Sequence, residues 1–354
     1  MADTQLSKQM KFSFITGQIN AITGSIPQVS TAWSRQDLWE TIKVRWSVGR
    51  MNYKVEPGIY AVGRPAEKSP VFVSANFKLS FDHLRRALND MNAWMLVLDT
   101  KGINVWCAAG KGTFGTKELT RQINQVKLDK IVDHHKLIVP QLGAVGVSAH
   151  EIKKNTGFSV VYGPVRAEDI PAFMEAGMKA TTEMRKVNFS TWDRLKLIPV
   201  ELINEKKYIV LIPAIFLILS GFNPKGYSLD LAYHDGLRSV FILLIAYFCG
   251  CVVTPVLLPW IPFRRFALKG LLMGWLAAFI LSCFHLLGHG KIELISWFFL
   301  IGSVSSFLAM MFTGTSTFTS LSGVKKEMKT ALPSQITMAG LGVVAWIVAK
   351  FVVL

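Results

Sequence analysis

Residues 70–100 read PVFVSANFKLSFDHLRRALNDMNAWMLVLDT, and this stretch decides the fold of the N-terminal half. Both of its ends are short apolar runs rich in β-branched or aromatic residues, which predicts buried strands. Between them Phe81, Leu84 and Leu88 recur at helical spacing, and Ser80 is a candidate N-cap. The order strand, helix, strand indicates a β-α-β unit with parallel strands.

The same alternation continues along the chain. The expected strands are 70–74, 94–98, 136–139 and 158–162, and the expected helices are 80–88, 116–126, 148–154 and 167–176. This pattern predicts an α/β, Rossmann-like domain with a parallel sheet. Ligands of such sheets bind at the carboxyl ends of the strands. We therefore expect one crevice lined by residues that follow the strands, namely Ser74, Asn76, Thr100, Gly102, Gly143 and Gly163.

The C-terminal part is much more apolar than the N-terminal part, and 51% of all residues are hydrophobic. A membrane span needs about 20 mostly apolar residues. The sequence predicts an all-α transmembrane bundle of about five helices, at 208–222, 240–259, 270–287, 294–313 and 336–354. The first is short and is interrupted by Pro213. The expected organisation is an extension (1–50), an α/β domain (51–195), a linker (196–207) and a membrane domain (208–354).

Loop charges predict the orientation of the bundle. Basic residues precede the first segment (Lys206, Lys207) and occupy the second and fourth loops (Arg264, Arg265, Lys269; Lys325, Lys326, Lys329), whereas the other loops are balanced. The positive-inside rule then places the N-terminal domain in the cytoplasm, at the cytoplasmic membrane. The formal net charge of +16 suits anionic lipid, and no nucleic-acid motif accompanies it, so no nucleic-acid partner is expected.

The chain has four cysteines, and their spacing matches neither a disulfide framework nor a zinc or iron–sulfur site. Three lie in apolar runs. Among these, Cys283 lies near His285, a pair that could bind a soft metal, although a hydrogen-bonded histidine at a helix end explains it as well. Cys107 is the single cysteine of the N-terminal half.

The segment around Cys107 reads NVWCAAGK (104–111). Asn104 can cap a short helix, on which Cys107 and Lys111 share one face. A helix start and a nearby ammonium both favour a thiolate. Small residues at 108–110 would admit a large flat ligand. A buried structural cysteine remains an alternative, and a catalytic nucleophile is another, although His134 and His135 form no recognisable base motif. Gly110–Thr113 does not match a phosphate-binding loop.

This octapeptide resembles the cap-helix signature of the corrinoid protein of microbial mercury methylation, a family that joins such a domain to a bundle of about five spans. The domain is also similar to the corrinoid domain of the corrinoid iron–sulfur protein of acetyl-CoA synthesis, over about residues 40–190. The matching stretches are 53–63, 71–79, 98–102, 112–116 and 140–143. The cluster-binding cysteine run of the iron–sulfur protein is absent.

The resemblance implies a corrinoid-dependent methyltransferase with a cobalamin-type cofactor in its methylcobalamin form. Cys107 is then the catalytic residue and the lower axial thiolate ligand of cobalt. The methyl group passes from Co(III)–CH₃ to mercuric ion and forms methylmercury. The remaining corrinoid contacts are expected from Asn104, Val105, Trp106, Ala108, Ala109, Gly110 and Lys111, together with the strand-end residues.

The same resemblance implies partners. A ferredoxin-like iron–sulfur protein would supply electrons, and a methyl-folate or its methyltransferase would supply the methyl group. Two other functions stay open at this point. The chain could be a corrinoid carrier of one-carbon metabolism with another methyl acceptor, or a non-catalytic membrane protein with an α/β docking domain.

Overall fold

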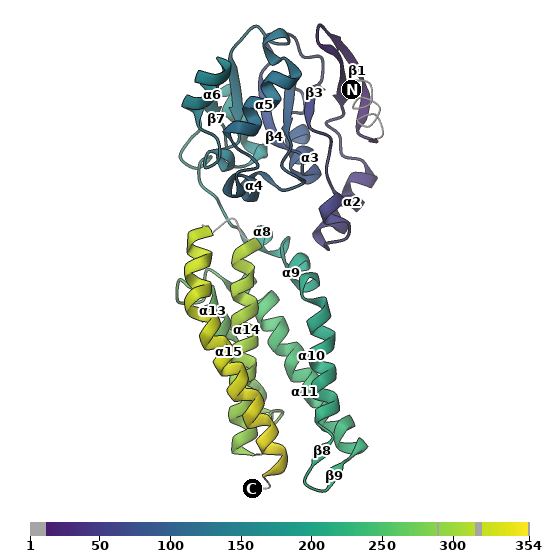
Figure 1. Ribbon diagram of the computed structural model, residues 1–354, viewed down its shortest axis with the longest axis vertical. Helices are drawn as coiled ribbons and strands as arrows, with labels where there is room; N and C mark the ends of the chain where they lie inside the picture. Colours follow the sequence, from purple (N-terminus) through teal and green to yellow (C-terminus); the bar gives the residue numbers. More distant parts are fainter. Residues whose placement is uncertain (1–11, 289, 316–320, 353–354) are drawn as a thin grey trace. The chain divides into compact units, whose positions relative to one another are not determined.

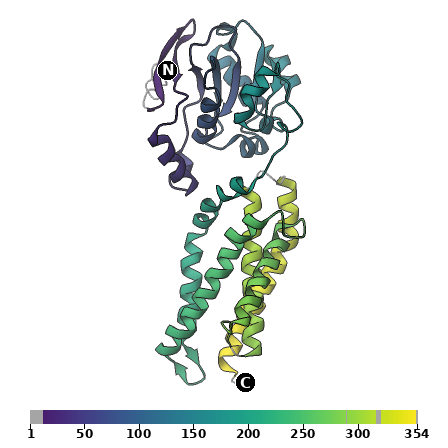
Figure 2. The same ribbon diagram turned by 180° about the vertical axis from the view of Figure 1, so that it is seen from behind.

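The structure is a computed structural model that describes residues 12–288, 290–315 and 321–352. The chain divides into two compact units, one up to Asn188 and one from Phe189 onward, with Arg45–Ser47 grouped with the second. The first unit is an α/β domain and the second is almost entirely helical (Figures 1 and 2).

A seven-stranded sheet forms the centre of the first unit, as far as the structure describes the chain. Its strand order is β1-β2-β3-β5-β4-β6-β7. The strands are β1 (Ile15–Ala21), β2 (Gly24–Val29), β3 (Gly58–Val62), β4 (Val71–Ala75), β5 (Ala93–Leu98), β6 (Lys136–Val139) and β7 (Ser159–Tyr162).

The sheet is mixed, so the prediction of a parallel sheet is right for only part of it. Strands β5, β4, β6 and β7 run parallel to one another, as expected. Strand β3 is antiparallel to β5, and the hairpin β1–β2 extends the sheet beyond β3. The hairpin lies in residues 1–50, which the sequence analysis treats as an extension.

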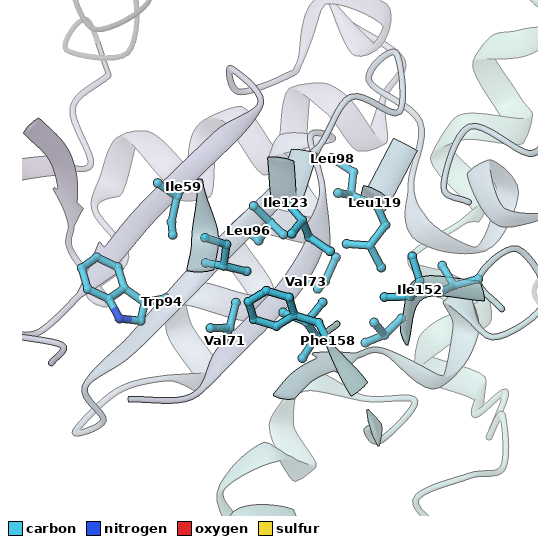
Figure 3. Close-up of a cluster of buried hydrophobic side chains, with 14 of the residues drawn as sticks. Ile59, Val71, Val73, Trp94, Leu96, Leu98, Leu119, Ile123, Ile152 and Phe158 are labelled. Carbon is cyan, nitrogen blue, oxygen red and sulfur yellow. The ribbon is translucent and has the colours of Figure 1, made fainter. Parts of the chain in front are cut away.

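Helices cover both faces of this sheet. Successive side chains of a strand point to opposite faces, so each buried strand contributes to a hydrophobic core on both sides. In β3, Ile59 and Ala61 join one core, and Tyr60 and Val62 join the other. The first core is closed by α4 (Val105–Lys111), α5 (Thr116–Val126) and α6 (Ala149–Thr156), and Figure 3 shows part of it. The second is closed by α3 (Lys78–Ala87) and α7 (Ile170–Glu175).

Most helix boundaries agree with those predicted from the spacing of apolar residues. Helix α5 spans 116–126 as predicted, and Ser148 caps α6 through its side chain. Ser80 as the N-cap of α3 is wrong, because the helix already begins at Lys78 with Phe77 at the cap position. The described residues of this unit also form α2 (Arg35–Arg45) and short 3₁₀ turns at Arg50–Asn52, Leu128–Lys130, Gln141–Gly143 and Ala167–Asp169.

The second unit is a helical bundle. It contains α8 (Thr191–Leu195), α9 (Ile198–Asn204), α10 (Lys206–Leu219), α11 (Leu229–Phe248), a π-helical segment (Cys249–Val253), α12 (Thr254–Leu257), α13 (Phe266–Cys283), α14 (Lys291–Thr315) and α15 (Leu321–Phe351). A two-stranded hairpin, β8 (Phe222–Asn223) and β9 (Gly226–Tyr227), joins α10 to α11. The rings of Phe216, Trp297 and Trp346 meet in its core. Helices α13 and α14 approach closely, since a Cβ at Gly270 or Gly274 would collide with Ser305.

Four helical stretches of the described residues are long and apolar enough to cross a membrane: Leu229–Leu257, Phe266–Cys283, Lys291–Gly314 and Ser322–Phe351. The prediction of about five spans is thereby corrected to about four. The first predicted span forms α10, which has 14 residues and is only about 21 Å long at 1.5 Å per residue. The hydrocarbon core of a bilayer is about 30 Å thick.

Candidate functional site

Parallel strands β4, β5, β6 and β7 bring their carboxyl ends to one edge of the sheet. Asn76 follows β4, Thr100 and Gly102 follow β5, and Gly163 follows β7. The residues predicted from strand ends therefore share one edge. Ser74 lies two residues before Asn76, inside β4, where it is buried.

The side chain of Asn76 connects two of these strand ends. Its Oδ1 accepts hydrogen bonds from the Thr100 N–H (3.1 Å), the Thr100 hydroxyl (2.9 Å) and the Gly102 N–H (2.9 Å). Asn76 and Thr100 are both buried. Because Gly102 has a φ of 72°, the chain turns sharply here. The sequence-predicted residues Asn76, Thr100 and Gly102 thus form one buried cluster that fixes the loop leading into α4.

Helix α4 carries the predicted ligand. The Asn104 side chain accepts a hydrogen bond from the Cys107 N–H, as the sequence predicts for an N-cap. Val105, Ala108 and Ala109 are buried in the first core. Trp106 and Cys107 are half-buried, and Gly110 and Lys111 are exposed. The inner face of α4 is therefore anchored in the domain, while the free thiol of Cys107 stays partly accessible.

A second loop presses against α4 from the end of β6. A Cβ at Gly143 would lie 2.5 Å from the Phe114 ring, and one at Gly146 would lie 2.1 Å from the Phe114 carbonyl oxygen. Gly143 is thus required for packing, and Gly163 likewise packs on β6, where a Cβ would lie 3.1 Å from Ile138. Between the two loop glycines, Val145 is 76% exposed, an apolar surface beside α4.

Arg50 is the functional candidate that the sequence analysis misses. Its guanidinium carbon lies 5.4 Å from the centre of the Phe77 ring, beside the end of β4. Burial lowers the pKa of Arg50 below its usual value, and the neighbouring Cys107 sulfur opposes that shift by favouring the charged form. Arg50 is therefore a cation that interacts with Cys107, whereas Lys111, the cation expected from the sequence, is exposed. No local sequence signal connects Arg50 to Cys107, because the two are far apart in the chain.

Within the described residues no group of three or more His, Cys, Asp or Glu side chains could hold a bare metal ion. The Cys107 sulfur could serve as the single protein ligand of a metal whose other ligands belong to a bound cofactor, as in a corrin. The half-exposed sulfur, the small residues of α4 and the exposed Val145 fit such a flat, largely apolar group.

Comparison with known proteins connects this site to corrinoid proteins. Residues 43–174 match the family model described as CO dehydrogenase/acetyl-CoA synthase delta subunit. The first unit therefore contains a domain related to that family. The matched range includes Cys107, Asn76 and Arg50.

Three relatives show the extent of the similarity. The acetyl-CoA decarbonylase/synthase complex subunit gamma of Methanopyrus kandleri is 32% identical over 124 residues, which is 34% of this chain and 26% of the relative. The same subunit of Archaeoglobus fulgidus is 31% identical over 38% of this chain and 29% of the relative. The corrinoid/iron-sulfur protein large subunit of Moorella thermoacetica is 32% identical over 35% of this chain and 28% of the relative. The chain thus spans less than a third of the length of these relatives.

Proposed function

We propose that this chain is a membrane-anchored corrinoid methyltransferase in which Cys107 is the lower axial ligand of cobalt. One observation carries the proposal. The half-exposed thiol of Cys107 stands on a capped helix at the carboxyl edge of the parallel strands, inside residues 43–174, which match the CO dehydrogenase/acetyl-CoA synthase delta subunit family.

The residues of the chain have distinct roles in this proposal. A bound corrinoid would supply the cobalt that carries the methyl group. The Asn104 cap and the buried Val105, Ala108 and Ala109 hold α4 in place, so the Cys107 sulfur has a fixed position. The Arg50 guanidinium offsets negative charge on that sulfur. A thiolate is a soft, strong donor, which suits a soft metal.

We propose mercuric ion as the methyl acceptor, because Hg²⁺ is a soft electrophile that can take the methyl group together with both electrons of its bond to the metal. This transfer gives CH₃Hg⁺. A bound corrinoid would supply the methyl group, and its remethylation after the transfer would need two electrons. We therefore propose a ferredoxin-like electron donor as a partner and, as the resemblance implies, a methyl-folate or its methyltransferase as the methyl source.

The four membrane-length helices support anchoring in the cytoplasmic membrane. Loop charges place the basic loop at Arg264 and Arg265 on the cytoplasmic side, together with the N-terminal unit. The four long helices alone would put the residues before Leu229 on the side opposite Arg264. The proposed orientation therefore needs the 14-residue α10 to pass through a locally thinned bilayer.

A second function has support from the comparisons. The relatives from methanogens and from Archaeoglobus are named as subunits of the acetyl-CoA decarbonylase/synthase complex. A corrinoid carrier of one-carbon metabolism with a different acceptor therefore uses the same site and the same Cys107 chemistry.

The test is methyl transfer by the anaerobically purified full chain, loaded with methylcobalamin. Mercuric ion and a thiol are offered in separate reactions, and the cobalt content of each sample is measured. Methylmercury formation that is lost in Cys107→Ala supports the proposal. Transfer to the thiol alone favours the second function, and a chain that retains no corrinoid excludes both.

A further inference from the structure

Helix α2 exposes its apolar side chains and buries a charged one. Asp37 is only 2% exposed, and Val44 on the same side of the helix is also buried. On the opposite side, Leu38, Trp39 and Ile42 are 49%, 58% and 48% exposed. At about 100° per residue these three side chains form one continuous stripe, which we name the α2 stripe.

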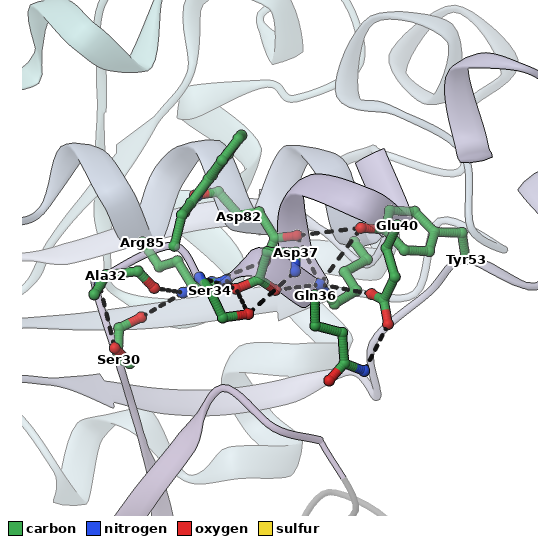
Figure 4. A network of polar contacts seen from close by, with 11 residues as sticks. Ser30, Ala32, Ser34, Gln36, Asp37, Glu40, Tyr53, Asp82 and Arg85 are labelled. Carbon is green, nitrogen blue, oxygen red and sulfur yellow. Dashed lines mark hydrogen bonds and ion pairs between the residues drawn. The ribbon is translucent and has the colours of Figure 1, made fainter. Parts of the chain in front are cut away.

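A buried ionic network explains why Asp37 faces inward (Figure 4). Its carboxylate contacts the Lys78 ammonium at 3.0 Å and the Arg85 guanidinium at 2.9 Å. Both cations also contact Asp82, each at 2.8 Å. Arg85 further donates to the carbonyl oxygens of Ser30 and Ala32. The network fixes the rotation of α2, so the α2 stripe is held outward.

Basic residues flank the α2 stripe. Arg35 and Lys43 are exposed on α2, and the Lys43 ammonium lies 5.6 Å from the centre of the Trp39 ring. The acidic residues of this helix point elsewhere, since Asp37 is buried and Glu40 contacts Lys78 at 3.3 Å. Trp, Leu and Ile on one side with Arg and Lys beside them are the residue types by which helices contact the membrane interface.

We infer that α2 docks the α/β unit on the surface of an anionic bilayer, with the α2 stripe inserted below the headgroups and Arg35 and Lys43 on the lipid phosphates. The inference rests on the proposed membrane anchoring, which keeps the bilayer near this unit. Charge complementarity selects the lipid surface as the occupant, because a basic rim around an apolar stripe matches anionic headgroups above acyl chains.

Docking of α2 fixes the orientation of the Cys107 site relative to the bilayer. Lys78, which holds Asp37, is the first residue of α3 and follows Asn76 by two positions at the end of β4. A rigid ionic contact therefore joins the membrane-bound helix to the sheet edge that carries Cys107. The site then has a fixed direction relative to the bilayer, which suits a partner or acceptor delivered at the membrane surface.

The test measures depth with a nitroxide label on the full chain in nanodiscs of phosphatidylglycerol and phosphatidylethanolamine. Trp39→Cys and Ile42→Cys place the label in the α2 stripe, and Gln36→Cys is the matched control, exposed on the same helix outside the stripe. Cys107→Ser and Cys283→Ser remove the other accessible thiols, while Cys249 and Cys251 are buried. Collisions with oxygen, which concentrates in lipid, and with a water-soluble nickel chelate are compared.

We expect high oxygen and low nickel accessibility at residues 39 and 42, and the reverse at residue 36. Replacing the lipid by neutral phosphatidylcholine, or introducing Arg35→Glu with Lys43→Glu, should raise nickel accessibility in the stripe. High nickel accessibility at 39 and 42 in anionic lipid means that the stripe faces water and overturns the inference. Low accessibility to both reagents means that protein covers the stripe and overturns it too.

These outcomes are independent of the cofactor, because the label reports depth whether or not corrinoid is bound. Extraction with alkaline carbonate tests the anchoring separately. A chain that carbonate releases contradicts the anchoring, whereas a retained chain with a water-facing stripe contradicts only the docking of α2.

Discussion

The side-chain oxygen of Asn104 accepts a 2.9 Å hydrogen bond from the backbone N–H of Cys107. The residue that starts α4 therefore also fixes the backbone of the proposed cobalt ligand. Because the capping residue stands three positions before the cysteine, the local sequence is sufficient to form this hydrogen bond.

Asn104→Ala should loosen α4. Loss of an N-cap costs roughly 1 kcal/mol, and the inner face of α4 is buried, so the domain should still fold. We expect faster hydrogen exchange in 105–111 and weaker corrinoid retention. Ser148→Ala is the matched control, because it removes the cap of α6. Equal corrinoid retention in the two variants would contradict the role of the cap at Cys107.

Arg50→Gln should slow alkylation of Cys107 in the cofactor-free chain, because it removes the guanidinium that interacts electrostatically with this sulfur, and a nearby cation speeds the reaction of a cysteine. Arg50→Lys should keep part of the rate. Lys111→Ala is the matched control on α4 and should change the rate little, since an exposed i,i+4 pair contributes only about 0.2–0.5 kcal/mol. Iodoacetamide modification is followed by peptide mass spectrometry in a Cys283→Ser background. A larger decrease in the alkylation rate from Lys111→Ala than from Arg50→Gln would contradict the assignment of the charge effect to Arg50.

Lys78→Met should strongly destabilise the α/β unit. It leaves Asp37 and Asp82 buried without their shared cation, and breaking a buried ion pair costs about 3–5 kcal/mol. Lys186→Met provides the comparison, because its pair with Glu183 is exposed and such pairs contribute only about 0–1 kcal/mol. Hydrogen exchange in α3 of the full chain measures both. Similar protection of α3 in the two variants would show that the network contributes little.

Acid should destabilise the same network. Burial alone raises the pKa of Asp37, but hydrogen bonds from Ser34 and Lys78 and the charge of Arg85 outweigh it, so the pKa lies well below the ordinary value of 3.8. A depressed pKa in the folded state stabilises the fold above 3.8, and this stabilisation is lost as pH falls below it. We expect protection of α3 to fall as the pH drops below about 4. In Asp37→Asn this part of the pH dependence should be absent, and an unchanged acid response would exclude Asp37 as its source.

Topology is decided by two engineered cysteines, introduced one at a time into a background that carries Cys107→Ser and Cys283→Ser. A cysteine at Arg264 should react only from the cytoplasmic side, because the positive-inside rule retains basic loops there. One at the exposed Asp230 should react only from outside. Labelling of both from the same side would mean that the stretch Leu229–Leu257 does not cross. The reverse pattern would place Arg264 outside and contradict the charge argument.

Local patterns predicted the elements that surround the site. Phe81, Leu84 and Leu88 mark the buried face of α3, and the cap at Asn104 and the turn at Gly112 bound α4 where the sequence indicates. The strand-end residues Asn76 and Thr100 meet because parallel strands end at the same edge.

Contacts between residues far apart in the chain could not be predicted from local sequence patterns. Strand β2 contains Pro27, a residue that argues against a strand, and it is held by pairing with β1 and β3. The turn at 50–52 brings Arg50 over the Phe77 ring, where its charge interacts with Cys107, a residue far away in the sequence. The predicted span 208–222 ends three residues too late, because its apolar run continues into Phe222, which belongs to β8, whereas α10 ends at Leu219.

The most direct test of the central claim is cobalt X-ray absorption of the corrinoid-loaded full chain, compared with Cys107→Ala. We predict one sulfur atom in the cobalt coordination shell of the unaltered chain and its loss in the variant, with the four equatorial nitrogens unchanged. A shell without sulfur in the unaltered chain, or the same sulfur contribution in both proteins, would contradict Cys107 as the axial ligand.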